Sequence, residues 1–99
     1  MVGPPIINKE NKMRRIIEDK DISEFDNLLG KNVLVLCLNY FYFGKLIGAN
    51  SSFIELEESQ IVYETGKFSN KKWEQAESLP SSIWYIRTST IESYGEVTK

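Results

Sequence analysis

Residues 30 to 58 read GKNVLVLCLNYFYFGKLIGANSSFIELEE, and this stretch decides the fold class. The segment from Val33 to Leu38 is continuously apolar and too short for a typical helix, so it predicts a buried strand. Consecutive aromatic residues at 40–43 favour a second strand, because aromatic side chains suit a pleated, half-buried surface. From Phe53 to Glu58 apolar and acidic residues alternate, which is typical of a third, half-buried strand.

Two glycines, Gly44 and Gly48, interrupt the second predicted strand, and the polar segment 50–52 predicts a turn before the third. A glycine inside a strand marks a bulge or a sharp bend, at which a small sheet can curl on itself. Three consecutive strands with two such bends therefore predict a small antiparallel barrel.

The end of the sequence completes this prediction with two more short strands, at Ile83–Arg87 and Ile91–Tyr94. The expected fold is mainly β, a small, five-stranded, strongly bent antiparallel barrel. Apolar and aromatic terminal strands invite pairing with another chain, and head-to-tail pairing that closes gives a ring. The residues predicted at such an interface are Trp84, Ile86, Ile91 and Tyr94.

An N-terminal α-helix is predicted to precede the barrel and to cover one of its mouths. Residues 21–24 have the form of a capping box, with an acceptor at Asp21 and a glutamate three residues later. An apolar stripe follows, and Gly30 ends the helix because glycine adopts the left-handed conformation without penalty. The stripe consists of Ile22, Phe25, Leu28 and Leu29.

Residues 1–20 form a predicted basic arm that precedes the barrel domain of residues 21–99. Its apolar residues Met13, Ile16 and Ile17 have helical spacing, so a short helix is plausible there. The arm is either a solvated turn of helix with one apolar side or a basic contact for phosphate. Its basic residues are Lys9, Lys12, Arg14, Arg15 and Lys20.

The third strand is predicted to have a break or a bulge at Ser59–Gln60 and to resume through Tyr63, and a long loop, 65–82, follows it. Ser69 can cap a short helix in this loop, and Pro80 would end it. Lysines 67, 71 and 72 make a small basic spot beside Trp73. Trp73 either contacts a nucleic-acid strand by stacking or packs the loop helix onto the sheet.

Composition excludes several classes of function. The chain has 99 residues, no histidine and one cysteine, Cys37, so an intrachain disulfide and a thiolate zinc site are both excluded. Cys37 lies in an apolar strand and is expected to be a buried structural thiol, since a nucleophile requires a polar, electropositive setting. Nucleotide-binding glycine motifs are absent, and most carboxylates follow solvated patterns. We therefore expect no enzyme activity, no cofactor and no metal.

The formal net charge of −2 gives no overall basic field, so any nucleic-acid site must be local. The sequence contains no apolar run of membrane-spanning length. Its start lacks the charged-then-apolar pattern of a signal peptide. These observations predict a cytoplasmic protein without membrane contact.

The order and spacing of several short motifs resemble the Sm/LSm family, which belongs to the SH3-like barrel class, over residues 22–94. The first family motif is matched by the alternating Val33, Val35 and Cys37, then by residues 44–46, Asn50 and residues 53–56. The second is matched in spacing by IRTSTIESY at residues 86–94, and the segment LLGK at 28–31 is similar to the exit of the family's helix.

This resemblance implies a homo-oligomeric ring of about five to seven subunits, in which the fourth strand of one subunit pairs with the fifth strand of the next. It also implies that single-stranded RNA binds around the pore by stacking and charge. Asn50 takes the position of the family's loop-ordering aspartate, and Phe53 that of the base-binding asparagine or of the stacking residue beside it. Arg87 takes the position of the pore arginine, and Thr88 replaces the glycine that follows it.

Two departures leave alternatives open. Phe53 can stack on a base but cannot hydrogen-bond to its edge, and Thr88 requires a last turn of different shape. Asn50 is otherwise a turn former, Phe53 a core residue and Arg87 part of a surface or subunit salt bridge. The leading hypothesis is a homo-oligomeric Sm-like ring that binds RNA weakly or with altered specificity. The alternative is a structural or protein-binding ring that has lost RNA binding.

Overall fold

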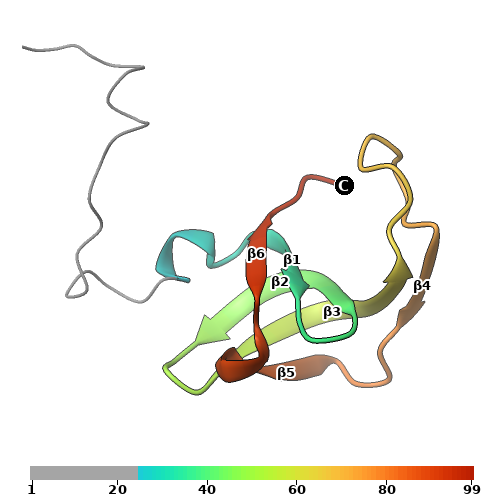
Figure 1. Cartoon of the computed structure of the whole chain (residues 1–99). Helices are drawn as coiled ribbons and strands as arrows, with labels where there is room; N and C mark the ends of the chain where they lie inside the picture. Colours follow the sequence, from blue (N-terminus) through green and yellow to red (C-terminus); the bar gives the residue numbers. More distant parts are fainter. Residues whose placement is uncertain (1–24) are drawn as a thin grey trace, which may run out of the picture.

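The computed structural model describes residues 25–99, and their main feature is one six-stranded antiparallel sheet. Its strands run in the order β4-β3-β2-β1-β6, and β5 also pairs with β3 (Figure 1). The strands are β1 (Asn32–Leu36), β2 (Phe41–Ala49), β3 (Phe53–Glu64), β4 (Gln75–Ser78), β5 (Ile83–Arg87) and β6 (Ser93–Glu96). The prediction of a mainly β, antiparallel fold is confirmed.

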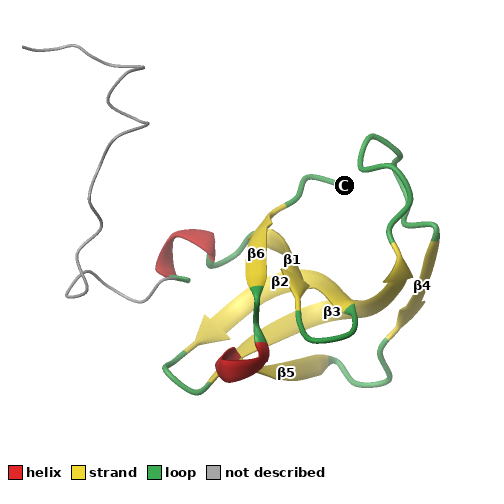
Figure 2. Ribbon diagram, viewed as in Figure 1, coloured by secondary structure: helices red, strands yellow, loops and turns green. Residues whose placement is uncertain are grey.

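The sheet is curved but not closed, so the predicted five-stranded barrel is not supported. Among the described strands, β5 pairs only with β3 and β6 only with β1. The short 3-10 helix η2 (Thr88–Thr90) lies between β5 and β6 and separates them in the chain (Figure 2). Because η2 occupies residues 88–90, the last strand begins at Ser93, two residues later than predicted.

The N-terminal α-helix is also not supported in the described residues, where the 3-10 helix η1 (Asp26–Leu28) stands in its place. The arm 1–20 and the capping box 21–24 lie outside the described residues. The segment after η1 is not helical because its backbone bonds to β2. The Gly30 N–H donates to Leu46 O at 2.7 Å, and the Leu46 N–H donates to Lys31 O at 2.9 Å. Gly30 has a φ of 84°, the left-handed conformation expected of a glycine that ends a helical turn.

The concave side of the sheet holds the main hydrophobic core. Alternate residues of the strands contribute to it, as the period of two requires. Cys37 is among them at 7% exposed, which confirms the prediction of a buried thiol. The buried cluster consists of Phe25, Val33, Val35, Cys37, Leu46, Ile54, Leu56 and Ile86.

Both predicted glycine bends in β2 are confirmed, because the register between β2 and β3 shifts between Phe43 and Lys45 and again between Leu46 and Gly48. At Gly44 the two backbones approach closely. A Cβ there would lie 3.0 Å from the Ser59 Cβ and 3.1 Å from the Glu57 carbonyl oxygen. Only a glycine fits this crossing without a local shift.

Of the break or bulge predicted at Ser59–Gln60, the structure shows a bulge, since β3 continues to Glu64. The bulge is marked by Glu58, one residue earlier than predicted, at a φ of 52°. Residues 53–57 pair with β5 and residues 60–64 with β4, so the bulge divides β3 into two halves.

The two halves bury side chains on opposite faces. Leu56 lies opposite Leu46, whereas Val62 lies opposite Phe41, five positions away on β2. An odd separation along a strand places side chains on opposite faces. Leu56 and Val62 are both fully buried, so the sheet has a second, smaller apolar cluster on its convex side.

The predicted helix in the loop 65–82 is wrong, since Gln75–Ser78 form β4. Strand pairing satisfies the backbone groups along the second half of β3, and this tertiary gain outweighs the local helix pattern. Residues 65–74 remain a loop, closed by the Glu74 N–H donating to Thr65 O at 3.3 Å. No helix among residues 25–99 is long and apolar enough to cross a membrane.

Candidate nucleic-acid interface

The turn between β2 and β3 is organised by the side chain of Asn50. Its Oδ1 accepts hydrogen bonds from the backbone N–H of Ser52 at 2.7 Å and of Phe53 at 2.9 Å. The Asn50 N–H in turn donates to Phe53 O at 3.0 Å. These three bonds fix an Asx-type turn, so Asn50 has the loop-ordering role expected of it.

A second segment, the junction of β5 and η2, docks onto this turn through Thr88. The Thr88 N–H donates to Ser52 O at 2.9 Å, and its Oγ1 donates to Ser51 O at 2.8 Å. Thr90 Oγ1 donates to Arg87 O at 2.8 Å and so holds the other side of the junction. The hydroxyl bond of Thr88 ties together two segments that are far apart in the sequence.

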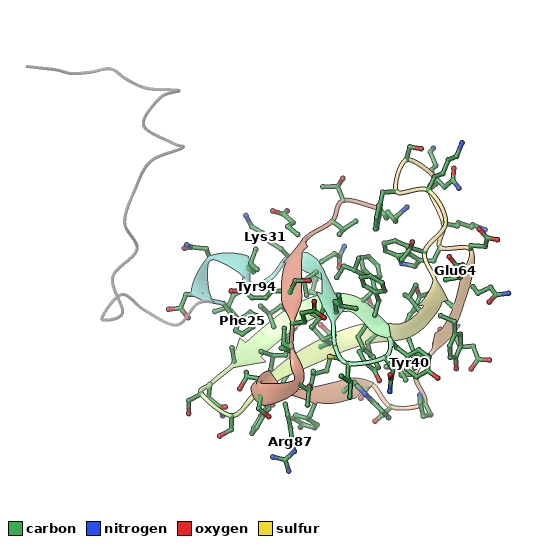
Figure 3. The ribbon with its side chains drawn as sticks, in the orientation of Figure 1. Phe25, Lys31, Tyr40, Glu64, Arg87 and Tyr94 are labelled. Carbon is green, nitrogen blue, oxygen red and sulfur yellow. The ribbon has the colours of Figure 1, made fainter. Side chains whose placement is uncertain are left out.

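An exposed surface, the aromatic platform, lies beside this junction and consists of Phe53, Tyr85 and Arg87. Phe53 is directly opposite Arg87 in the β3–β5 register. The Phe53 and Tyr85 rings meet edge to face, with centroids 5.4 Å apart and planes at 85°. Tyr85 is 56% exposed, and Arg87 extends away from the ribbon into solvent (Figure 3).

The structure thus brings together all four residues predicted to contact RNA, Asn50, Phe53, Arg87 and Thr88. It adds Tyr85, which was not among the predicted contacts. Tyr85 could have been identified from the sequence by the alternation of inward and outward side chains along β5. Because Ile86 points into the core, its neighbours on both sides point outward on one face.

The charge around the platform is mixed. Arg87 forms no ion pair within residues 25–99. Glu55 lies opposite Tyr85, and Glu57 lies opposite both Ile83 and Lys45. A single unpaired guanidinium beside two rings can attract a phosphate or stack on a base, but the nearby carboxylates weaken the attraction for a polyanion.

Behind the junction, Cys37 is a structural thiol and not a reactive one. Burial raises the pKa of its thiol, and the hydrogen bond from Thr90 opposes this only in part. Thr90 Oγ1 lies 3.7 Å from the sulfur. No cluster of three or more metal-ligating side chains occurs among the described residues.

The predicted interface side chains point mostly toward the chain's own core. Ile86 is only 5% exposed, and Trp84 and Ile91 pack against the core cluster. Tyr94 is 37% exposed, with its ring centroid 4.5 Å from that of Phe25 (Figure 3). Three of the four side chains are thus packed within the chain itself. The groups of β5 and β6 that can pair with another chain are therefore the backbone N–H and C=O groups at their edges.

Comparison with protein-family models found no match for the chain, and comparison with curated proteins found none either. The resemblance to the Sm/LSm family therefore stays a prediction. The geometry of the platform and of the strand edges stands independently of it.

Proposed function

We propose that this chain is a subunit of an Sm-like ring that binds single-stranded RNA on the aromatic platform. The observation that supports this most is the docking of Thr88 onto the β2–β3 turn. That contact gathers Asn50, Phe53 and Arg87, which are separated by up to 37 positions in the sequence.

The platform's chemistry suits an unpaired base. A base stacks on Phe53 or Tyr85, while Arg87 contacts the adjacent phosphate or covers the base by cation–π contact. The Phe53 ring carries no hydrogen-bonding group, so stacking on it tolerates any base, and the contact of Arg87 with phosphate makes the proposed interaction strongly dependent on salt.

The proposed ring assembly uses β5 and β6, two of the three described strands that have a single partner each; the third is β4. Within residues 25–99, β5 pairs only with β3 and β6 only with β1. An unpaired strand edge presents backbone donors and acceptors to another chain. Pairing of β5 with β6 of the next subunit closes on itself as a ring and repeats the platform once per subunit. Repetition raises the avidity for one RNA strand without any new contact.

An anisotropy titration with a uridine-rich RNA oligonucleotide at low salt tests RNA binding. We expect Arg87→Ala to weaken binding by about tenfold and to lower the slope of log K against log salt by about one. Lys31→Ala, which removes an equal charge from a surface pair with Glu96, is the matched control and should leave the affinity unchanged. Equal binding by both variants and the native chain would contradict the proposal.

The second candidate is a structural or protein-binding ring without RNA. Glu55 and Glu57, which share the platform's face, and the net charge of −2 favour it. It predicts the same assembly but no RNA binding by the native chain at low salt.

A further inference from the structure

A second surface lies on the convex side of the sheet, over the other half of β3. It is a cavity of about 450 Å³ between the loop 65–74 and the strands below it, lined by Phe43, Lys71, Lys72, Trp73, Glu74 and Lys99 among others. We call it the Trp73 pocket. Its volume falls within the range of about 300–1,000 Å³ that is usual for small-molecule sites.

The indole of Trp73 forms an aromatic wall of this pocket. It meets the Phe43 ring at 5.2 Å between centroids and 72° between planes, and the Phe68 ring at 6.2 Å and 87°. These edge contacts fix the orientation of the indole against β2. Trp73 therefore does pack onto the sheet, but it stays only half-buried and lines an open cavity.

The pocket carries an excess of positive charge that is not neutralised. Lys71 and Lys72 are exposed and form no ion pair within the described residues. The ammonium of Lys99 lies 4.4 Å from the Trp73 ring centroid and donates to the carbonyls of Phe68 and Asn70. The partners of the Lys99 ammonium among the described residues, two carbonyls and the indole ring, are all neutral. Three lysines and one glutamate line the cavity, so a local positive field exists in a chain of net charge −2.

The loop that bears the lysines is held in shape by hydrogen bonds. The Asn70 N–H donates to Lys67 O at 3.0 Å, in addition to the bond between Glu74 and Thr65. Gly66, at a φ of 69°, makes the turn, and the Glu74 side chain lies against it. The segment at 97–99 approaches this loop in space (Figure 1). Little ordering is then needed when an anion binds.

Trp73 lines the pocket together with three lysines, of which Lys99 lies over its ring, and this combination suits a ligand with one flat ring system and one phosphate. We propose that the Trp73 pocket binds a nucleotide, with the base stacked on Trp73 and the phosphate held by Lys71, Lys72 and Lys99. The site lies over the second half of β3 and shares no residue with the aromatic platform, so it goes beyond the proposed RNA-binding ring.

The test is a titration of the isotope-labelled full chain with uridine monophosphate at low salt, followed by NMR of the two indole N–H signals. Trp73 lines the pocket and Trp84 lies on β5, so Trp84 is an internal control. We expect the Trp73 signal to shift saturably while the Trp84 signal stays in place. A shift near Trp84 alone would report binding at the platform's half of the molecule and would overturn this proposal without touching the RNA hypothesis.

Paired lysine variants test the charge requirement. Lys71→Ala with Lys72→Ala should raise the dissociation constant by about tenfold or more. Lys31→Ala with Lys45→Ala makes the same charge change away from the pocket and should have little effect. Equal weakening in both pairs, or no saturable shift, would overturn the proposal. If inorganic phosphate produces the same shift of the Trp73 signal at the same concentration, the site binds anions without recognising the base, and the nucleotide proposal is also overturned.

Discussion

The two halves of β3 use one strand in two different ways. Before Glu58, the side chains of Ile54 and Leu56 fill the concave core, and the strand pairs with β5 beside the aromatic platform. After Glu58, Val62 is buried on the convex side, and the strand pairs with β4 below the Trp73 pocket. A single residue in the left-handed conformation separates the two halves. One bulge thus lets one strand support two apolar clusters and two candidate binding surfaces.

The largest expected effect is the loss of packing in the first half. Leu56 is fully buried within the main core, so Leu56→Ala should lower the free energy of unfolding by about 3 kcal/mol through lost burial and a residual cavity. Urea unfolding measures it. Leu38→Ala is the matched control, because Leu38 is 85% exposed, and it should change stability by less than about 0.5 kcal/mol. Similar losses in the two variants would mean that the first half does not build the core.

The bulge itself is tested at Gly44, where β2 crosses β3. Gly44→Ala places a Cβ against the backbone of Glu57 and Ser59 and should cost about 2 kcal/mol. Gly95→Ala adds the same methyl group where no atom lies within 4 Å and should be nearly neutral. Thermal unfolding of the two variants side by side distinguishes them. If alanine is tolerated as well at Gly44 as at Gly95, β2 and β3 are farther apart at Gly44 than the structure indicates.

A smaller effect is expected at the turn that organises the platform. Asn50→Ala removes an acceptor of two backbone hydrogen bonds and should cost about 1 kcal/mol in unfolding free energy. Asn50→Asp keeps both acceptor bonds and should restore most of that loss. If the aspartate variant is as unstable as the alanine variant, the turn depends on something other than this side-chain oxygen.

The smallest effect is a dependence on pH that arises from Cys37. Its pKa is raised in the folded state by burial, so the folded chain keeps the thiol proton at pH values where the unfolded chain has lost it. Its contribution to stability is therefore fully present below its ordinary value of 9.0 and is lost as pH rises above it. The stability difference between the native chain and Cys37→Ala should fall above that pH, with a slope no steeper than about 1.4 kcal/mol per pH unit. A difference that stays constant from neutral to alkaline pH would contradict this.

The first half of β3 could be predicted well from the sequence because its signals are local. Alternation from Phe53 onward, the two glycines of β2 and the turn at Asn50 each report on their immediate surroundings, and the structure confirms all of them. The position of Arg87 near that turn followed from motif spacing.

A strand at residues 61–63 could also be predicted, but the surroundings of this second half could not, because they depend on distant partners. The segment 75–78 has helical spacing with its neighbours, yet it forms β4 because β3 offers an unpaired edge. Likewise, among the described residues before Gly30 the structure has the 3-10 helix η1 in place of the predicted α-helix, because the Gly30 N–H bonds to Leu46 O. The Trp73 pocket needs both the bulge and Lys99, which no local pattern connects. Tertiary pairing overrode local propensity in each case.

The central claim is that the edges of β5 and β6 close a ring that repeats the aromatic platform. Native mass spectrometry of the full chain tests it most directly, since the monomer has a mass of 11.4 kDa. The account predicts one dominant species of about five to seven times that mass, stable on dilution. A monomer at every concentration would contradict the ring, and with it the placement of Arg87 around a pore.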